Sequence, residues 1–164
     1  IALKIEDIKL FMNKLLKTEV FDEFEVVSIE LTTISKFSID GTINHSYFSS
    51  DDKELFGSRK YVKWVEIKDI ILNTIKGSKQ PTNIKIIFSL SDKSKTSIIE
   101  KASSSLEEKD INGFYLNILF ENNILKVITG TNYSLFTLDK SIENYYDTSI
   151  QKFFKSHQID IILL

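Results

Sequence analysis

The stretch GFYLNILFENNILKVITGT, residues 113–131, constrains the fold more than any other part of the sequence. Apolar and polar residues alternate on both sides of the pair Asn122-Asn123, as they do in two β-strands that each bury one face. Asparagine tolerates a positive φ, so this pair fits the two central positions of a type I′ turn. The stretch therefore predicts an antiparallel hairpin that turns at Asn122-Asn123.

The two-residue turn also determines which side chains share a face of the hairpin, because the pairing is counted outward from it. We expect one apolar set to face inward: Phe114, Leu116, Ile118, Phe120, Leu125 and Val127. The other face carries a mixed set, expected to lie under a helix at one end and in water at the other: Tyr115, Asn117, Leu119, Lys126 and Ile128. Nothing on it converges as catalytic residues would, so the hairpin is interpreted as part of a core.

Apolar periodicity predicts further elements on both sides of the hairpin. The predicted helices cover residues 6–17, 61–76, 92–103 and 141–156. The predicted strands are 2–5, two or three strands between 25 and 48 with a turn at Asp40-Gly41, 84–90 and 134–138. The apolar tail IDIILL, residues 159–164, is expected either to add a final strand or to pack on the core. Residues 49–60 are polar and charged, and are expected to form a mobile loop.

The two halves of the chain show the same order of elements: strand, helix, two or three antiparallel strands, helix. These pseudo-repeat halves span about 1–77 and 83–156, without residue-by-residue identity between them. The order predicts an α+β fold, an antiparallel sheet with helices on one side. At 164 residues the chain fits a single domain, 1–164.

Composition narrows the classes of function. The absence of cysteine excludes disulfides, thiolate metal sites and cysteine nucleophiles, and fits a reducing compartment. The net charge is −2, with 21 basic and 23 acidic residues, so no global positive field attracts nucleic acid or an anionic membrane. No apolar run approaches the roughly 18 residues of a membrane span, and the first residues lack signal-peptide features. We therefore expect a cytoplasmic protein without membrane contact.

One local pattern resembles a contact with single-stranded nucleic acid. In GSRKYVKW, residues 57–64, Arg59, Lys60, Tyr61 and Lys63 bring basic groups and an aromatic face together. The competing interpretation is structural packing, because Trp64 also falls on the apolar stripe of the predicted helix and an acidic run precedes the stretch. We favour packing, and expect at most weak, non-specific binding of DNA here.

Metal and catalytic sites have little support in the sequence. His45 and His157 are the only histidines, and a metal site needs three or more converging ligands. His45 with Asp51 and Asp52 is a conceivable site, but a solvated strand end beside an acidic loop is the simpler interpretation. No nucleophile motif or phosphate-binding loop is present. The sequence predicts no catalytic residue, no metal and no cofactor.

The whole chain resembles an uncharacterised family of small bacterial proteins, known as a domain of unknown function. The phrases that carry the resemblance are KFSIDGTI at 36–43, KIIFSLS at 85–91, GFYLN at 113–117, VITGTNYSLFTLDKS at 127–141 and IQKFFKSH at 150–157. The resemblance implies no activity, substrate or catalytic residue. A looser, topological likeness is to the domain of DNA sliding clamps, from which the helices near 61–76 and 141–156 depart as additions.

Three functional hypotheses follow. The leading one is a non-enzymatic cytoplasmic binding or adaptor domain whose partner is another protein, because the sequence is rich in core signals and poor in reactive groups. The alternative is a nucleic-acid-associated domain with clamp-like topology that uses lysine-bearing helix faces. A weaker alternative is a metal-dependent or hydrolytic enzyme built around His45 or His157.

Overall fold

A computed structural model of the chain describes residues 1–77 and 79–164. Over these residues the chain forms an eight-stranded antiparallel sheet with the order β3-β2-β5-β6-β7-β1-β8, and β4 pairs with β2 beside β3. The strands are β1 (Ala2–Ile5), β2 (Glu25–Thr32), β3 (Lys36–Asp40), β4 (Val62–Lys63), β5 (Asn83–Ser89), β6 (Ile111–Glu121), β7 (Ile124–Tyr133) and β8 (Ile161–Leu163). The helices are α1 (Ile8–Lys17), α2 (Lys53–Phe56), α3 (Trp64–Ile75), α4 (Asp92–Lys101) and α5 (Ser141–Ser156), with 3₁₀ turns at His45–Tyr47 and Glu108–Asp110.

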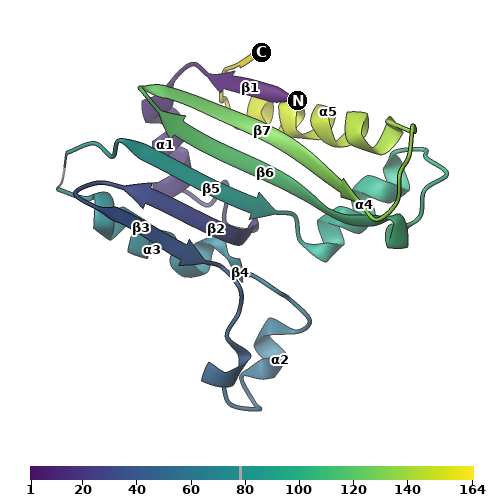
Figure 1. Ribbon diagram of the computed structural model, residues 1–164, viewed down its shortest axis with the longest axis horizontal. Helices are drawn as coiled ribbons and strands as arrows, with labels where there is room; N and C mark the ends of the chain where they lie inside the picture. Colours follow the sequence, from purple (N-terminus) through teal and green to yellow (C-terminus); the bar gives the residue numbers. More distant parts are fainter. Residues whose placement is uncertain (78) are drawn as a thin grey trace.

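The predicted hairpin is confirmed as β6 and β7. Glu121 pairs with Ile124, and Asn122 and Asn123 have φ values of 52° and 59°, as a type I′ turn requires. The six side chains predicted to face inward are at most 4% exposed. They lie against the helices, which cover one side of the sheet (Figure 1). The α+β prediction, with an antiparallel sheet and helices on one side, is therefore confirmed.

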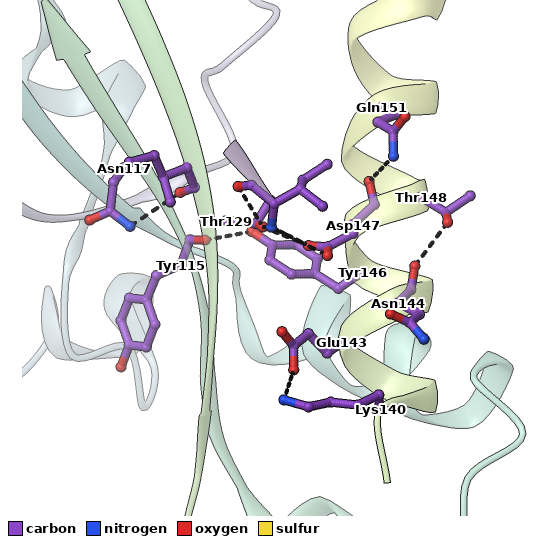
Figure 2. Close-up of polar contacts among 12 residues, drawn as sticks. Tyr115, Asn117, Thr129, Lys140, Glu143, Asn144, Tyr146, Asp147, Thr148 and Gln151 are labelled. Carbon is purple, nitrogen blue, oxygen red and sulfur yellow. Dashed lines mark hydrogen bonds and ion pairs between the residues drawn. The ribbon is translucent and has the colours of Figure 1, made fainter. Parts of the chain in front are cut away.

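The opposite face of the sheet carries none of the long helices. Tyr115 and Asn117 project from β6 away from α5 (Figure 2). Tyr115, Asn117, Leu119 and Ile128 are only half-buried there, and Lys126 is exposed. No helix covers either end of this hairpin face among the described residues, which differs from the expectation for one end. An antiparallel sheet tolerates this arrangement because a half-polar face can meet water.

The end of α1 is tied to α3 by side chains. The last carbonyls of a helix lack partners within it. The indole N–H of Trp64, a fully buried side chain, donates to the carbonyl oxygen of Leu15 at 2.7 Å. The ammonium of Lys68 donates to the carbonyl oxygen of Thr18 at 3.0 Å and forms an ion pair with Asp22. These bonds hold α1 and α3 side by side.

Helix α5 is held against β6 and β7 by two buried polar side chains. The hydroxyl of Tyr146 donates to the carbonyl oxygen of Tyr115 at 2.9 Å, and Asp147 accepts a hydrogen bond from the hydroxyl of Thr129 (Figure 2). Burial, followed by the nearby charge of Asp147, raises the pKa of the Tyr146 phenol, which therefore stays neutral and able to donate.

Two predicted elements are wrong. The β2–β3 turn lies at Thr33–Ser35 and not at Asp40-Gly41. At Asp40-Gly41, β3 ends and the chain enters the segment 41–61, which we call the excursion. Glycine is needed at 41 because the backbone of Val26 approaches too closely for any side chain. Residues 134–138 form no strand: β7 ends at Tyr133, and Leu135, Phe136 and Leu138 are exposed in the loop before α5. Alternation alone predicted this strand, and none of the described strands pairs with these residues.

The excursion, residues 41–61, extends away from the sheet (Figure 1). Its expected loop contains the short helix α2, and the rings of Phe48 and Phe56 lie 4.2 Å apart between centroids. The first half has α2 and β4 between β3 and α3 in addition to the predicted elements, and the second half has two strands between α4 and α5. Strands of the two halves pair with each other: β1 pairs with β7 and β8, and β5 pairs with β2. Among the described residues, no helix has the length and apolar character to cross a membrane.

Candidate functional site

The residues predicted for nucleic-acid contact lie at the start of α3, where carboxylates neutralise two of them. The guanidinium of Arg59 binds Glu66 through both terminal nitrogens, at 2.8 and 3.4 Å. The ammonium of Lys63 forms an ion pair with Glu23 at 2.6 Å. A phosphate would have to compete with these carboxylates for both cations.

The remaining members of the stretch offer little room for stacking a base. The ammonium of Lys60 lies 5.2 Å from the centre of the Tyr61 ring, and Tyr61 is half-buried. Trp64 is in the core and does not form a stacking platform. Close by, burial, followed by the charge of Asp92, raises the pKa of the Glu25 carboxyl. The stretch is a mixed-charge, packed part of the surface, and its role in nucleic-acid binding stays a hypothesis.

Neither histidine belongs to a group of candidate metal ligands among the described residues. His45 is exposed at the start of a 3₁₀ turn, and the imidazole of His157 packs against the ring of Phe153, with centroids 4.7 Å apart. Within the described part of the chain, no three histidine or carboxylate side chains gather as metal ligands.

A long groove runs between α1 and α3 and reaches the tip of the β6–β7 hairpin. It consists of two adjoining hollows, of about 540 and 890 Å³, which share Lys9, Met12, Leu16 and Ile75. Its apolar floor is only partly covered by the protein itself: Ile8, Met12, Leu72 and Ile75 are half-buried. We call this feature the α1–α3 groove.

Helical spacing explains the floor. Ile8, Met12 and Leu16 follow one another at four-residue intervals on α1, and Leu72 and Ile75 are three residues apart on α3. Residues at these spacings share a helix face. Because Trp64 and Lys68 hold the two helices together, the stripes meet along one line. Met12 adds a flexible, polarizable side chain that adapts to different apolar partners.

The rim of the α1–α3 groove is basic. Lys9 and Lys17 on α1 and Lys76 at the end of α3 are exposed, and none forms an ion pair with any residue that the structure describes. Asp7, the only carboxylate on the lining, accepts a hydrogen bond from the Leu10 amide at 2.8 Å and caps α1. The groove therefore presents an apolar floor between uncompensated positive charges.

A second groove, of about 690 Å³, lies between α4 and α5 and is more mixed in character. Its rim carries Lys93 and Lys101, but also Glu23 and several serine hydroxyls. Its floor includes Ile98, Ile150 and Phe153, of which Ile150 is already buried. Charges of both signs and several hydroxyls on the rim select no class of ligand, so the α1–α3 groove is the better candidate.

Sequence reasoning missed the α1–α3 groove, although it identified the lysines on the helix faces as a possible binding surface. The apolar stripes were interpreted as core, and most of each stripe is. Lysine flanks both apolar stripes in the sequence, and this pattern is the signal that could have indicated a binding groove. It gains meaning only once α1 and α3 are known to be neighbours, which local periodicity does not show.

The chain belongs to a family of unknown function (DUF5721), whose family model matches residues 14–161. The resemblance to an uncharacterised domain family is thereby confirmed. No curated protein matches the chain significantly, and no solved structure does. The family brings no activity with it, so a functional proposal has to rest on the geometry of the chain.

Proposed function

We propose that the protein is a non-enzymatic binding domain whose α1–α3 groove holds an acidic, amphipathic helical segment of another protein. The observation that carries this proposal is the combination of a half-open apolar floor with three unpaired lysines on its rim. Helix-in-groove recognition uses apolar anchors spaced along one face of the ligand helix. Ile8, Met12, Leu72 and Ile75 provide an extended floor for such anchors.

The charges on the rim favour an acidic ligand over a neutral or basic one. A carboxylate beside each apolar anchor would meet Lys9, Lys17 or Lys76 at the edge of the groove, where the interaction is partly shielded from water. Rim charges contribute mainly to association rate and to discrimination between partners, and the apolar floor supplies most of the affinity. Both parts should therefore be separable by mutation.

A nucleic-acid function is the second candidate, because the same three lysines gather on one surface, as a polyanion would require. The net charge of −2 and the apolar floor between the lysines support a protein ligand instead. The clamp-like topology remains a hypothesis, as does the cytoplasmic location. An enzyme built around His45 or His157 has no geometric support among the described residues.

The test is a fluorescence anisotropy titration with two labelled peptides of about 16 residues, which carry leucine at helical positions i, i+3, i+4 and i+7. One peptide has glutamate at the remaining polar positions, and the other has lysine. We expect the acidic peptide to bind at least roughly tenfold more tightly at low salt. The double variant Lys9→Glu/Lys76→Glu should abolish or reverse this preference.

Lys152→Glu/Lys155→Glu is the matched control, because it makes the same charge change on exposed positions of α5 outside the groove. It should change the affinity by less than about threefold. Met12→Glu should weaken both peptides, since it places a charge on the floor. Equal affinity for the two peptides would contradict the proposal, and tight, salt-sensitive DNA binding lost in Lys9→Glu/Lys76→Glu would favour nucleic acid.

A further inference from the structure

Strand β3 is an edge of the sheet with an open hydrogen-bonding side. Among the described residues, its strand partner is β2 alone (Figure 1). In an antiparallel pair, residues that bond to the partner alternate with residues whose amide and carbonyl groups point away from it. The amide of Gly41 donates to Val27, and the amide of Thr33 to Ser35, which fixes the odd-numbered residues as those that bond to β2. The backbone groups of Lys36, Ser38 and Asp40 therefore point outward.

The sequence of this edge, Lys36-Phe37-Ser38-Ile39-Asp40, is complementary to itself when it is reversed. Antiparallel pairing with a second copy, centred on Ser38, places Lys36 opposite Asp40, Phe37 opposite Ile39, and Ser38 opposite Ser38. In this register the three residues with outward backbone groups face one another, so their amides and carbonyls bond in pairs. Opposite charges directly across two strands stabilise the pairing, and apolar pairs do the same.

We propose that two copies of the chain associate through β3 in this register, forming a two-fold symmetric dimer with one continuous sheet. A two-fold interface brings the same patch of each subunit together, so self-complementarity is the property it requires. Edge strands often carry charges that keep other chains away. Here the charges at the two ends of β3 have opposite signs, so antiparallel self-pairing sets Lys36, which is already paired with Glu30 on β2, opposite a second carboxylate, Asp40 of the other copy.

The exposed apolar side chains near this edge support the same partner. Phe37 is 41% exposed at the outer strand, and Ile34, in the β2–β3 turn, is 99% exposed. The 41–61 excursion leaves the sheet at the Asp40 end of β3 (Figure 1). Antiparallel pairing places it beside the partner's β2–β3 turn. Tyr47 and Leu55, on the excursion, are exposed apolar side chains as well.

The first test is analytical ultracentrifugation of the whole chain between roughly 1 µM and 1 mM, a range suited to a small, weak interface. We expect a reversible transition to twice the 18.9 kDa mass of the chain. Amide hydrogen exchange supplies the position. The Ser38 amide should become protected as concentration rises, whereas the Ile39 amide, bonded to β2, should be protected throughout. A monomer over the whole range would overturn the proposal.

Charge reversal tests the register. Lys36→Asp sets two carboxylates against each other at both ends of the pair and should weaken the dimer roughly tenfold. The exchange variant Lys36→Asp/Asp40→Lys restores the opposition and should recover most of the loss. Lys126→Asp, on β7 away from the edge, is the matched control. Circular dichroism confirms that each variant is folded.

Ser38→Pro is the second variant designed to disrupt the dimer, because it removes an N–H that points outward from β3. If neither Lys36→Asp nor Ser38→Pro changes the dissociation constant of the dimer, the two copies associate through another surface and the β3 pairing is refuted.

Discussion

At the scale of single residues, the sequence correctly marks Gly41 as a special position, but the turn that it predicts there is the wrong physical reason. Asp-Gly is a strong turn signal, because glycine adopts positive φ without cost. Gly41 is absent from the positive-φ glycines of the described chain, which are Gly57 and Gly77. It is required by close approach instead: a Cβ atom at this position would lie 1.7 Å from the carbonyl oxygen of Val26.

We therefore expect Gly41→Ala to destabilise the protein by more than about 3 kcal/mol, since the clash involves backbone and β2 cannot move without disturbing β5. Gly130→Ala is the control within the same sheet, because the nearest atom to its added Cβ is 3.9 Å away. It should change the free energy of unfolding by less than about 1 kcal/mol. Urea denaturation of both variants measures the difference, and similar losses would show that the backbone around Val26 shifts to accommodate the added Cβ.

At the scale of elements, the sequence predicted what local periodicity determines and failed where contact with distant residues decides. The β6–β7 hairpin and α5, Ser141–Ser156, lie where they were expected, because the Asn122-Asn123 turn and the apolar spacing of the helix act over a few residues. The predicted strand at 134–138 fails because its alternating apolar residues face water. The α1–α3 groove required two stripes far apart in sequence to meet, so neither stripe alone could reveal it.

The loop at 134–140 is held in place by Asp139. Its carboxylate accepts hydrogen bonds from the Ser104 hydroxyl at 2.6 Å and from the Ser141 amide at 2.8 Å, where α5 begins. The Ser104 bond first, and then those from Ser141, lower the pKa of Asp139 from 3.8 to about 2. A lowered pKa means that the stabilising contribution is complete above the ordinary value near 3.8 and is lost as the pH falls through about 2.

An NMR titration that follows the carboxyl carbon of Asp139 should accordingly give a midpoint near 2. Ser104→Ala removes the largest contribution and should move the midpoint toward the ordinary value, with increased mobility of the loop below pH 4. A wild-type midpoint at the ordinary aspartate value would show that the Ser104 bond does not persist in solution.

At the scale of the whole molecule, the two halves of the chain are joined too intimately to be independent domains. The first strand of each half pairs outside its own half: β1 lies between β7 and β8, and β5 pairs with β2. The aromatic core crosses the same boundary. Trp64 and Phe21 from the first half pack against Phe88 from the second, with ring centroids 5.3 and 6.2 Å apart. The two halves therefore share one hydrophobic core.

We expect a fragment of residues 1–77 to be unfolded on its own, because it would keep the β2–β3 hairpin but leave β1 without a strand partner and expose the apolar faces of α1 and α3. A sheet of β2, β3 and the two-residue β4 with uncovered helices buries too little apolar surface to offset the entropy of ordering the chain. The ¹H–¹⁵N spectrum of this fragment should lack the chemical-shift dispersion of the full chain. The fragment 79–164, which lacks β1 and β2, should also give a poorly dispersed spectrum. A dispersed, cooperative spectrum from residues 1–77 alone would instead establish the half as a domain, and the interlocked strands would then be a contact between two domains.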